Sequence, residues 1–328
     1  MKTSMARVAI AAVAVGLLTA CSSGESSQTT RSSAAPAGFP RTVEQAMGPT
    51  TIPSQPQRVA ALDASYVDAT LMLDTKLVAF TQYNTIGDRL PDYLGKSRET
   101  YGSEAVSVGT LAAPSLEKVV ATKPDLIVSA KVRHEKIYPQ LTAIAPTVFS
   151  ETTGPTWKQN IRLLATALGK ESLAEQRIGE YETQAKKVGD GVKAKYGPDT
   201  TVSVVRFVDG PTRLYANKSF SGIVIKDAGL ARPEPQNVDK FTVEIGPEQI
   251  PLADGTKIFV STNGEKGIDA HTTFQQNPLW GSVAPKTVEV KDAEWMSAVS
   301  VQGAYRILSD IAKAFDVESP TIPAWIGN

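Results

Sequence analysis

The sequence predicts an α/β protein made of two lobes joined by one long helix. From residue 58 onward, short runs rich in β-branched residues alternate with helical patterns, which is typical of βα units around a largely parallel, buried sheet. The alternation stops once, between residues 157 and 196, where the chain has no strand pattern and no proline. The same alternation then resumes, so we expect a second lobe after the helical segment.

The first 20 residues have the order of an export signal. Lys2 and Arg7 come first, an apolar run over 8–18 follows, and this run is too short to span a bilayer comfortably. The stretch Leu18-Thr19-Ala20-Cys21 resembles the lipobox of bacterial lipoproteins, in which the cysteine receives diacylglycerol before cleavage. We therefore predict a signal peptide over 1–20, lipidation at Cys21 and anchoring to the outer face of the cytoplasmic membrane. An uncleaved membrane-spanning segment is the alternative.

Residues 21–40 are predicted to be a flexible, lipidated tether. They are almost entirely Ser, Thr, Ala, Gly, Pro and Gln, a composition that buries too little apolar surface to offset the entropy of ordering. The whole chain carries 34 basic and 34 acidic side chains, which gives no sign of nucleic-acid binding. Because the chain has one cysteine, packing alone must hold the exported body together.

The first lobe is predicted over residues 41–156. We expect its strands at 58–62, 76–82, 106–109, 125–130 and 147–150. We expect its helices at 65–73, 115–122 and 135–144, with Ser115 as a helix cap.

The second lobe is predicted over residues 197–328. Its expected strands are 201–208, 213–216, 257–261 and 287–290, and the first two form a hairpin. Its expected helices are 219–229, 247–252 and 299–315.

The connecting segment over 157–196 is predicted to contain one long amphipathic helix. After Gly169, apolar residues recur at steps of three and four: Ala174, Ile178, Tyr181, Ala185, Val188 and Val192. A helix of about 25 residues is nearly 40 Å long, enough to brace both lobes. A rigid helical link also predicts that ligand binding changes the arrangement of the lobes little.

Several motifs make this order similar to a known family. They are Pro56-Gln57-Arg58-Val59-Ala60-Ala61-Leu62, Val108-Gly109-Thr110, Pro114-Ser115-Leu116-Glu117, Lys123-Pro124-Asp125-Leu126-Ile127-Val128, Gly246-Pro247-Glu248-Gln249 and Asn277-Pro278-Leu279-Trp280. With the lipobox, tether and bracing helix, they resemble the class III substrate-binding lipoproteins of ABC importers. The resemblance implies two Rossmann-like lobes and a non-enzymatic protein without a cofactor. It also implies delivery of a ferric siderophore, haem or cobalamin to a permease dimer.

A second set of motifs narrows the expected ligand. The segments Val204-Val205-Arg206-Phe207, Arg213-Leu214-Tyr215 and Ser219-Phe220-Ser221-Gly222 are most similar to the ferric-siderophore binders of actinobacteria. Iron in such a complex is enclosed by the chelator's own oxygens, so the protein needs arginines and aromatic rings and no metal ligands of its own. Haem or cobalamin capture within the same family is the alternative. The sequence does not distinguish hydroxamate, catecholate and mycobactin-type siderophores.

Candidate ligand-binding residues follow from the position of strand ends. In α/β lobes, ligands bind beyond the carboxyl ends of parallel strands. That rule selects Tyr66, Tyr83, Lys131, Arg133, Trp157, Arg206, Arg213, Lys218, Phe220 and Trp295.

Some of these candidates have a second interpretation. Arg206, inside an apolar strand, either faces the cleft or pairs with a buried acid, and we favour the cleft. Arg133 is equally well a solvated loop cation. Tyr66 and Tyr83 lie either at the rim of the cleft or at the edge of the core, whereas Trp280 is assigned to the core.

Two glutamates are candidates for contact with the permease. Glu117 and Glu248 each follow a helix start, and each precedes a strand by a similar interval, so they occupy equivalent places in the two lobes. In the resembling family, one glutamate per lobe at these points meets arginines of the permease subunits. The alternative is that both are ordinary first-turn acids stabilised by the helix dipole.

Other classes of protein find little support. The two histidines, His134 and His271, lie in different lobes, which argues against a histidine-rich metal site. No nucleophile motif such as GxSxG, HExxH or a P-loop is present, which argues against an exported enzyme. An adhesin would not need strand-end arginines and aromatics. We therefore expect a monomeric, lipid-anchored binding protein.

Overall fold

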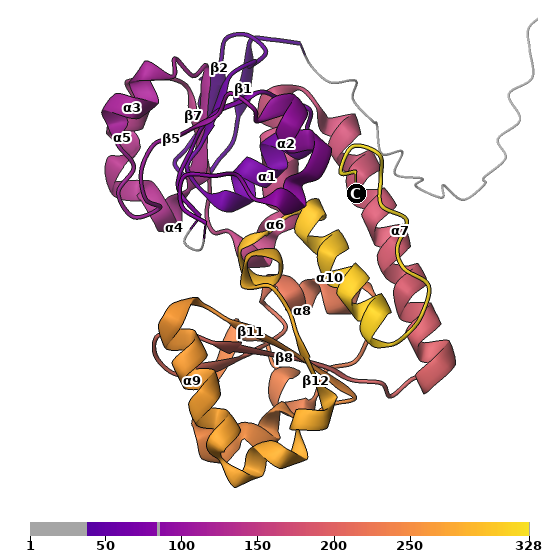
Figure 1. Cartoon of the computed structure of the whole chain (residues 1–328). Helices are drawn as coiled ribbons and strands as arrows, with labels where there is room; N and C mark the ends of the chain where they lie inside the picture. The colour runs from indigo at the N-terminus through magenta and orange to yellow at the C-terminus, as the bar shows by residue number, and fades with distance from the viewer. Residues whose placement is uncertain (1–37, 84–85, 328) are drawn as a thin grey trace, which may run out of the picture. The chain divides into compact units, whose positions relative to one another are not determined.

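Two five-stranded sheets organise the chain into the two α/β lobes that were predicted, although only four strands were expected in the second lobe (Figure 1). This computed structural model describes residues 38–83 and 86–327, so the predicted signal peptide, Cys21 and most of the tether lie outside it. The sheet of the N-terminal lobe has the order β5-β4-β3-β6-β7 and is parallel throughout. Its strands are β3 (Val59–Ala61), β4 (Leu77–Phe80), β5 (Val106–Ser107), β6 (Leu126–Ala130) and β7 (Thr147–Ser150). Its helices are α1 (Ala64–Met72), α2 (Gly95–Tyr101), α3 (Leu116–Ala121), α4 (Lys131–His134) and α5 (Tyr138–Thr142).

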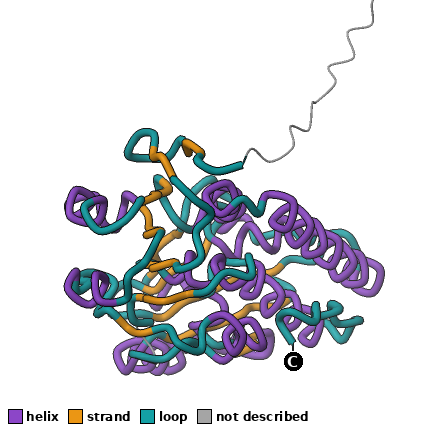
Figure 2. The backbone as a smooth tube through the Cα atoms, turned by 90° about the horizontal axis from the view of Figure 1, so that it is seen from above, coloured by secondary structure: helices purple, strands orange, loops and turns teal. Residues whose placement is uncertain are grey.

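The sheet of the C-terminal lobe is mixed and has the order β10-β9-β8-β11-β12. Its strands are β8 (Val202–Phe207), β9 (Thr212–Tyr215), β10 (Thr242–Ile245), β11 (Lys257–Thr262) and β12 (Thr287–Glu289). The strands β8, β11 and β12 are parallel, whereas β9 and β10 run antiparallel to their neighbours. The helices α8 (Phe220–Asp227) and α9 (Gly264–Gln276) follow β9 and β11. Strands run through the interior with helices around them (Figure 2).

The connecting segment contains two helices, and the periodicity predicted the second and longer one. It consists of α6 (Trp157–Leu168) and, after a turn at Gly169, α7 (Glu171–Tyr196). All six residues of the apolar stripe on α7 are buried. With 26 residues, α7 is about 39 Å long (Figure 1). It packs against α8 of the C-terminal lobe, and its Arg177 pairs with Asp74 of the N-terminal lobe at 2.9 Å.

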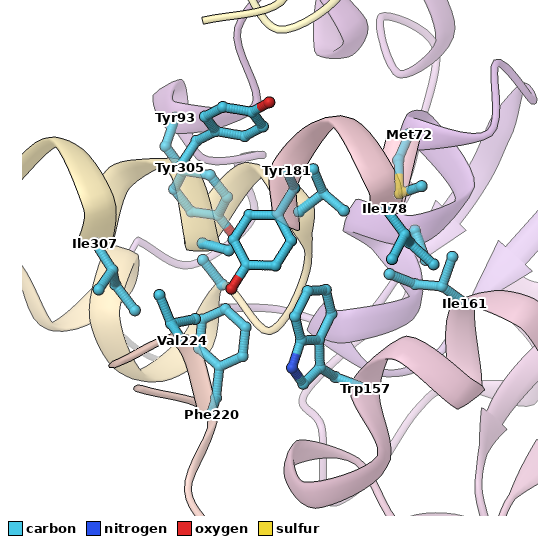
Figure 3. Packing of buried hydrophobic residues seen from close by; sticks show 14 of the residues in the cluster. Met72, Tyr93, Trp157, Ile161, Ile178, Tyr181, Phe220, Val224, Tyr305 and Ile307 are labelled. Atoms are coloured by element: carbon cyan, nitrogen blue, oxygen red, sulfur yellow. The ribbon is translucent and has the colours of Figure 1, made fainter. Parts of the chain in front are cut away.

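A shared apolar core joins the lobes. The helix α10 (Val301–Ala314) packs against α7, against α1 of the N-terminal lobe and against α8 of the C-terminal lobe. At their junction the ring of Trp157 lies 5.5 Å from that of Tyr181 and 5.4 Å from that of Phe220, and Tyr305 adjoins Tyr181 (Figure 3). One continuous cluster of buried residues therefore runs through both lobes, and each lobe adds a smaller cluster of its own.

The C-terminal tail packs against the connecting helix α7 and against α2 of the N-terminal lobe. After α10 the chain runs back along α7 towards α2 (Figure 1). The Arg177 guanidinium of α7 lies over the Trp325 ring at 4.3 Å, and the backbone N–H of Lys96 donates to the carbonyl of Ile326 at 2.8 Å. These contacts and the shared core oppose a wide hinge motion between the lobes.

Several elements of the structure were not predicted from the sequence. A small hairpin, β1 (Arg41–Val43) with β2 (Thr50–Ile52), precedes the first lobe, and α2, β10 and α9 were not predicted. The helix expected over 135–144 is a 3₁₀ turn followed by α5, in which Pro139 occupies the first turn. The helix expected over 247–252 is a 3₁₀ helix, Pro247–Ala253, because Pro251 cannot donate an α-helical hydrogen bond. Within the described residues, no helix is long and apolar enough to cross a membrane.

Candidate ligand-binding cleft

A cavity of about 340 Å³ lies where the carboxyl ends of the N-terminal strands face the C-terminal lobe. Each of the five parallel strands contributes a residue just beyond its end: Asp63, Tyr83, Leu111, Arg133 and Thr153. The C-terminal lobe contributes Arg206, Arg213, Tyr215, Phe220, Ser221, Phe241 and the segment 295–299. A cavity thus lies at the edge that the strand-end rule selects, and ligand binding there stays a prediction.

Arg206 both lines the cleft and pairs with a buried acid. Its Nε and Nη2 donate to the two carboxylate oxygens of Asp292 at 2.6 and 2.7 Å, and its Nη1 donates to the Tyr215 hydroxyl at 2.9 Å. Asp292 also accepts from the side-chain amide of Asn263 at 2.9 Å. The two interpretations open at the sequence level are thus compatible, because the ion pair holds the guanidinium in the cleft wall.

Arg213 lies directly opposite Arg206 in the β8–β9 pair. Its side chain is half-buried and lines the cleft, yet it forms no ion pair or hydrogen bond with any described residue, although the exposed Glu244 lies opposite it on β10. Like charges directly opposite each other on neighbouring strands are unfavourable, and Asp292 offsets only the charge of Arg206. The Arg213 guanidinium therefore keeps its hydrogen-bond donors free in the wall of the cleft.

The N-terminal wall of the cleft presents a second ion pair. Asp63 caps α1 by accepting from the Ser65 N–H at 3.0 Å, and it also accepts from Nε of Arg133 at 3.1 Å. The Arg133 side chain remains 40% exposed, so its remaining N–H groups are open to a ligand. Because Asp63 pairs with Arg133 and Asp292 with Arg206, Arg213 is the cleft arginine without an ion pair among the described residues.

Tyr83 connects this wall to a buried carboxylate. Its hydroxyl donates to Asp68 at 2.9 Å, and Asp68 also accepts from Tyr93 and from Ser300, which precedes α10. Burial raises the pKa of Asp68 to about 7, although these hydroxyl donors lower it. The Asp68 network therefore links the cleft, α1 and α10.

The apolar part of the cleft depends on Phe241 and Met296, neither of which the sequence analysis selected. Phe241 is 46% exposed, and its ring lies 5.4 Å from that of Tyr215. It precedes β10, so recognising that strand would have brought Phe241 under consideration. Met296 follows Trp295 in the segment after β12 and is partly buried in the same wall. An exposed aromatic face beside arginines suits a ligand with an apolar rim.

Four predicted cleft residues lie elsewhere. Lys131 pairs with Glu151 at 3.4 Å and does not line the cavity. Tyr66 is fully buried in the shared core, because it sits within the first turn of α1 and faces inward. Trp157 is also fully buried, with its ring turned towards Tyr181 and Phe220 (Figure 3). Lys218 pairs with Asp239 at 2.8 Å and lines a different cavity.

The remaining tryptophans differ in their surroundings. Trp295 forms part of the cleft wall but has no exposed surface, since it stacks on Phe259 at 4.7 Å and its indole N–H donates to Asp310 at 2.7 Å. Trp295 therefore stabilises the cleft wall from its buried side. Trp280 lies in the core of the C-terminal lobe, as predicted.

Glu117 and Glu248 occupy equivalent places in the topology of the two lobes. Both are exposed, and both lie in the first turn of a helix, α3 and the 3₁₀ helix Pro247–Ala253. Each helix leads into the strand, β6 or β11, that pairs in parallel with the first strand of its sheet in chain order. Neither glutamate forms an ion pair with a described residue.

The histidines serve the fold. His134 is buried, with Nδ1 2.7 Å from the Ser129 hydroxyl and Nε2 2.7 Å from the Leu111 carbonyl oxygen. His271 stacks on Phe207 at 4.6 Å. Among the described residues, no group of three or more His, Cys, Asp or Glu side chains could hold a metal ion.

The fold and the cleft define a substrate-binding protein of the class III type. The chain belongs to the periplasmic binding protein family, whose model matches residues 59–293, and it is a binding protein rather than an enzyme.

It is 34% identical to the probable siderophore-binding lipoprotein YfiY of Bacillus subtilis, over 96% of this chain and 99% of that protein. It is 25% identical to the Fe(3+) dicitrate-binding periplasmic protein FecB of Escherichia coli, over 87% and 93%. Staphylococcus aureus SirA complexed with staphyloferrin B superimposes with a TM-score of 0.76 at 27% identity, over 85% of this chain and 99% of SirA. The likeness to an actinobacterial branch stays a prediction.

Proposed function

We propose that this protein captures a ferric siderophore in the cleft between its lobes and delivers it to an ABC importer. The observation that carries the proposal is Arg213, a cleft arginine without an acidic partner among the described residues, next to Arg206 and Arg133. The names of the relatives support the same ligand class, since they refer to siderophores and ferric citrate.

The chemistry of the cleft suits an anionic iron chelate. Guanidinium groups donate hydrogen bonds to carboxylate, catecholate or hydroxamate oxygens, while Phe241 and Met296 provide an apolar surface. The iron would stay coordinated by its chelator, because the cleft offers donors and not metal ligands. The cleft acid Asp63 and the buried Asp292 behind Arg206 are already paired with arginines.

Tryptophan fluorescence tests this proposal directly. Trp295 lies in the cleft wall, so a bound ferric complex should quench it. The titration compares ferric citrate, a ferric hydroxamate and a ferric catecholate with the same chelators without iron, and with haem and cobalamin. We expect saturable quenching by at least one ferric siderophore at micromolar concentration or below. Saturation by haem or cobalamin alone, or by none of the compounds, would reject the siderophore.

Anchoring at Cys21 is the second part of the proposal. The relatives YfiY and YhfQ are both named as lipoproteins, and Cys21 follows a lipobox-like triplet. A Cys21→Ser variant should move from the membrane fraction to the medium or periplasm and should no longer incorporate labelled palmitate. A membrane-bound variant would indicate an uncleaved apolar segment instead.

Permease docking through Glu117 and Glu248 is the third part. One exposed, unpaired acid per lobe suits a monomer that meets two permease subunits. The double variant Glu117→Lys/Glu248→Lys should bind the ferric complex normally but fail to support uptake in cells. The matched control is Glu135→Lys/Glu265→Lys, which reverses two other exposed first-turn acids, one per lobe. Normal uptake by the first pair would return both residues to helix capping.

A further inference from the structure

A second cavity, of about 730 Å³, lies at the junction of the lobes and shares no lining residue with the cleft. It is bounded by the start of α6, by α8 and by the loop that follows α8. The cleft touches the first residues of α8, Phe220 and Ser221, whereas this cavity touches Ile223 and Lys226 farther along the helix. The turn at 153–157 and α8 therefore separate the two spaces.

Arg232 in the wall of this second cavity is a buried cation without a counter-charge. The side chain is 9% exposed, and no acid among the described residues pairs with it. Its Nη2 donates to the Tyr215 carbonyl and, at 2.6 Å, to the Gln236 side-chain oxygen, but Nε and Nη1 have no acceptor. Burial lowers the pKa of Arg232 to about 9. Because an unpaired buried charge is costly, we expect Arg232 to pair with an anion from outside the chain.

The rest of the wall is also richer in donors than in acceptors. Lys158 pairs with Asp227 at 2.9 Å, and Lys218 pairs with Asp239 at 2.8 Å, so the two acids of the cavity are already engaged. Lys226 has no acidic partner among the described residues. The buried indole N–H of Trp157 also lacks an acceptor. The buried groups of this wall that lack a partner, the Trp157 N–H and the Arg232 Nε and Nη1, are all donors, and the exposed Lys226 adds a positive charge.

We propose that this second cavity binds a small oxyanion, a carboxylate or a phosphate, independently of the siderophore cleft. Lys226 and Arg232 supply the charge, and small adjustments of the Arg232 and Trp157 side chains expose their free N–H groups to the ligand. Because Trp157 starts the connecting helices and Arg232 belongs to the C-terminal lobe, a bound anion would also fasten the junction between the lobes. Such an anion stabilises the folded chain by mass action.

The test compares two arginine variants with sodium phosphate, sodium succinate and sodium chloride as probes. Calorimetric titration of the wild-type protein should detect phosphate or succinate but not chloride. The Arg232→Gln variant should bind the same anion at least 10-fold more weakly, whereas the cleft variant Arg213→Gln should bind it unchanged. Failure of both oxyanions to bind, or loss of binding in Arg213→Gln alone, would overturn the proposal.

Thermal unfolding gives a second readout. In anion-free buffer, Arg232→Gln should be at least as stable as the wild type, because it removes an unpaired buried charge, and its melting temperature should not rise with phosphate or succinate. If Arg232→Gln does not fold, Trp157→Phe and Lys226→Gln replace it. Each of these variants should bind the anion more weakly than the wild type. Unchanged affinity in both would also overturn the proposal. The ferric complex should bind Arg232→Gln normally, so this test is separate from that of the siderophore cleft.

Discussion

The buried carboxylate of Asp68 should make the stability of this protein depend on pH in a way that one substitution removes. Asp68 is fully buried on α1, and its partners in the network are the hydroxyls of Tyr83, Tyr93 and Ser300. Burial raises its pKa from the ordinary value of 3.8 to about 7. Between pH 4 and pH 7, the Asp68 carboxyl is therefore protonated in the folded chain but ionised in the unfolded chain.

The sign and size of the effect follow by linkage. A group whose pKa is raised on folding contributes stability that is complete below 3.8 and is lost as the pH rises through about 7. The whole difference corresponds to about 4 kcal/mol, of which roughly 3 kcal/mol falls between pH 5 and pH 8. Because Asp68 has no exposed surface, solvent does not screen this contribution to the free energy of unfolding.

Urea unfolding at pH 5, 6, 7 and 8 measures this contribution. The free energy of unfolding of the wild type should fall over this range relative to that of Asp68→Asn, which keeps the shape of the protonated acid and does not titrate. Exposed Asp199→Asn is the matched control and should follow the wild type. Parallel curves for the wild type and Asp68→Asn would refute the reasoning, whatever the background slope from other groups.

Three further predictions concern packing, motion and the cleft ion pair. In α7, a Cβ at Gly189 would lie 1.6 Å from the Ala228 carbonyl oxygen, so Gly189→Ala should cost about 1–3 kcal/mol of stability in urea, whereas Gly179→Ala, in open space, should be neutral or slightly stabilising. Small-angle scattering should show nearly equal radii of gyration with and without a bound ferric siderophore, because the lobes share one core; a large contraction would contradict this. Arg206→Ala should lower stability by about 3–5 kcal/mol in urea, because it leaves Asp292 buried and unpaired; a neutral result would mean that the ion pair does not form.

The elements that the sequence predicted are those with strong local patterns. The stripe on α7 repeats six apolar residues at helical spacing, and the inner strands β3 and β6 are short, almost entirely apolar runs that are buried throughout. By contrast, the buried positions of α9 are Gly267, His271 and Phe274, of which only one is a large hydrophobic residue. Gly267 is needed there because a Cβ would lie 2.7 Å from the Phe207 carbonyl, a close approach that local periodicity does not reveal.

The cleft was predictable in position but not in detail. Knowing where strands end was enough to bring Tyr83, Arg133, Arg206, Arg213 and Phe220 to one cavity. The rule does not say which way a side chain points once a helix has begun, which is why Tyr66 and Trp157 are buried in the core instead.

The ion pairs of the cleft could not be predicted from the sequence, for a different reason. Arg206 and Asp292 are 86 residues apart in the chain and meet only because β8 and the segment after β12 end at the same edge of the sheet. For the same reason, the sequence could not show that Arg206 has an acidic partner while Arg213 has none among the described residues. Because replacing Arg206 also breaks its ion pair with Asp292, Arg213 is the better probe of ligand binding.

The most direct test of the siderophore cleft is the affinity of Arg213→Gln for the ferric complex that saturates the wild type. Lys218→Gln is the matched control, since Lys218 lies in the same lobe but outside the cleft. Fluorescence titration should show binding weakened by roughly 10- to 100-fold in Arg213→Gln, the scale of a charge-assisted hydrogen bond. Binding by Lys218→Gln should equal that of the wild type. Unchanged affinity in Arg213→Gln, or a larger loss in Lys218→Gln, would contradict the assignment of the cleft.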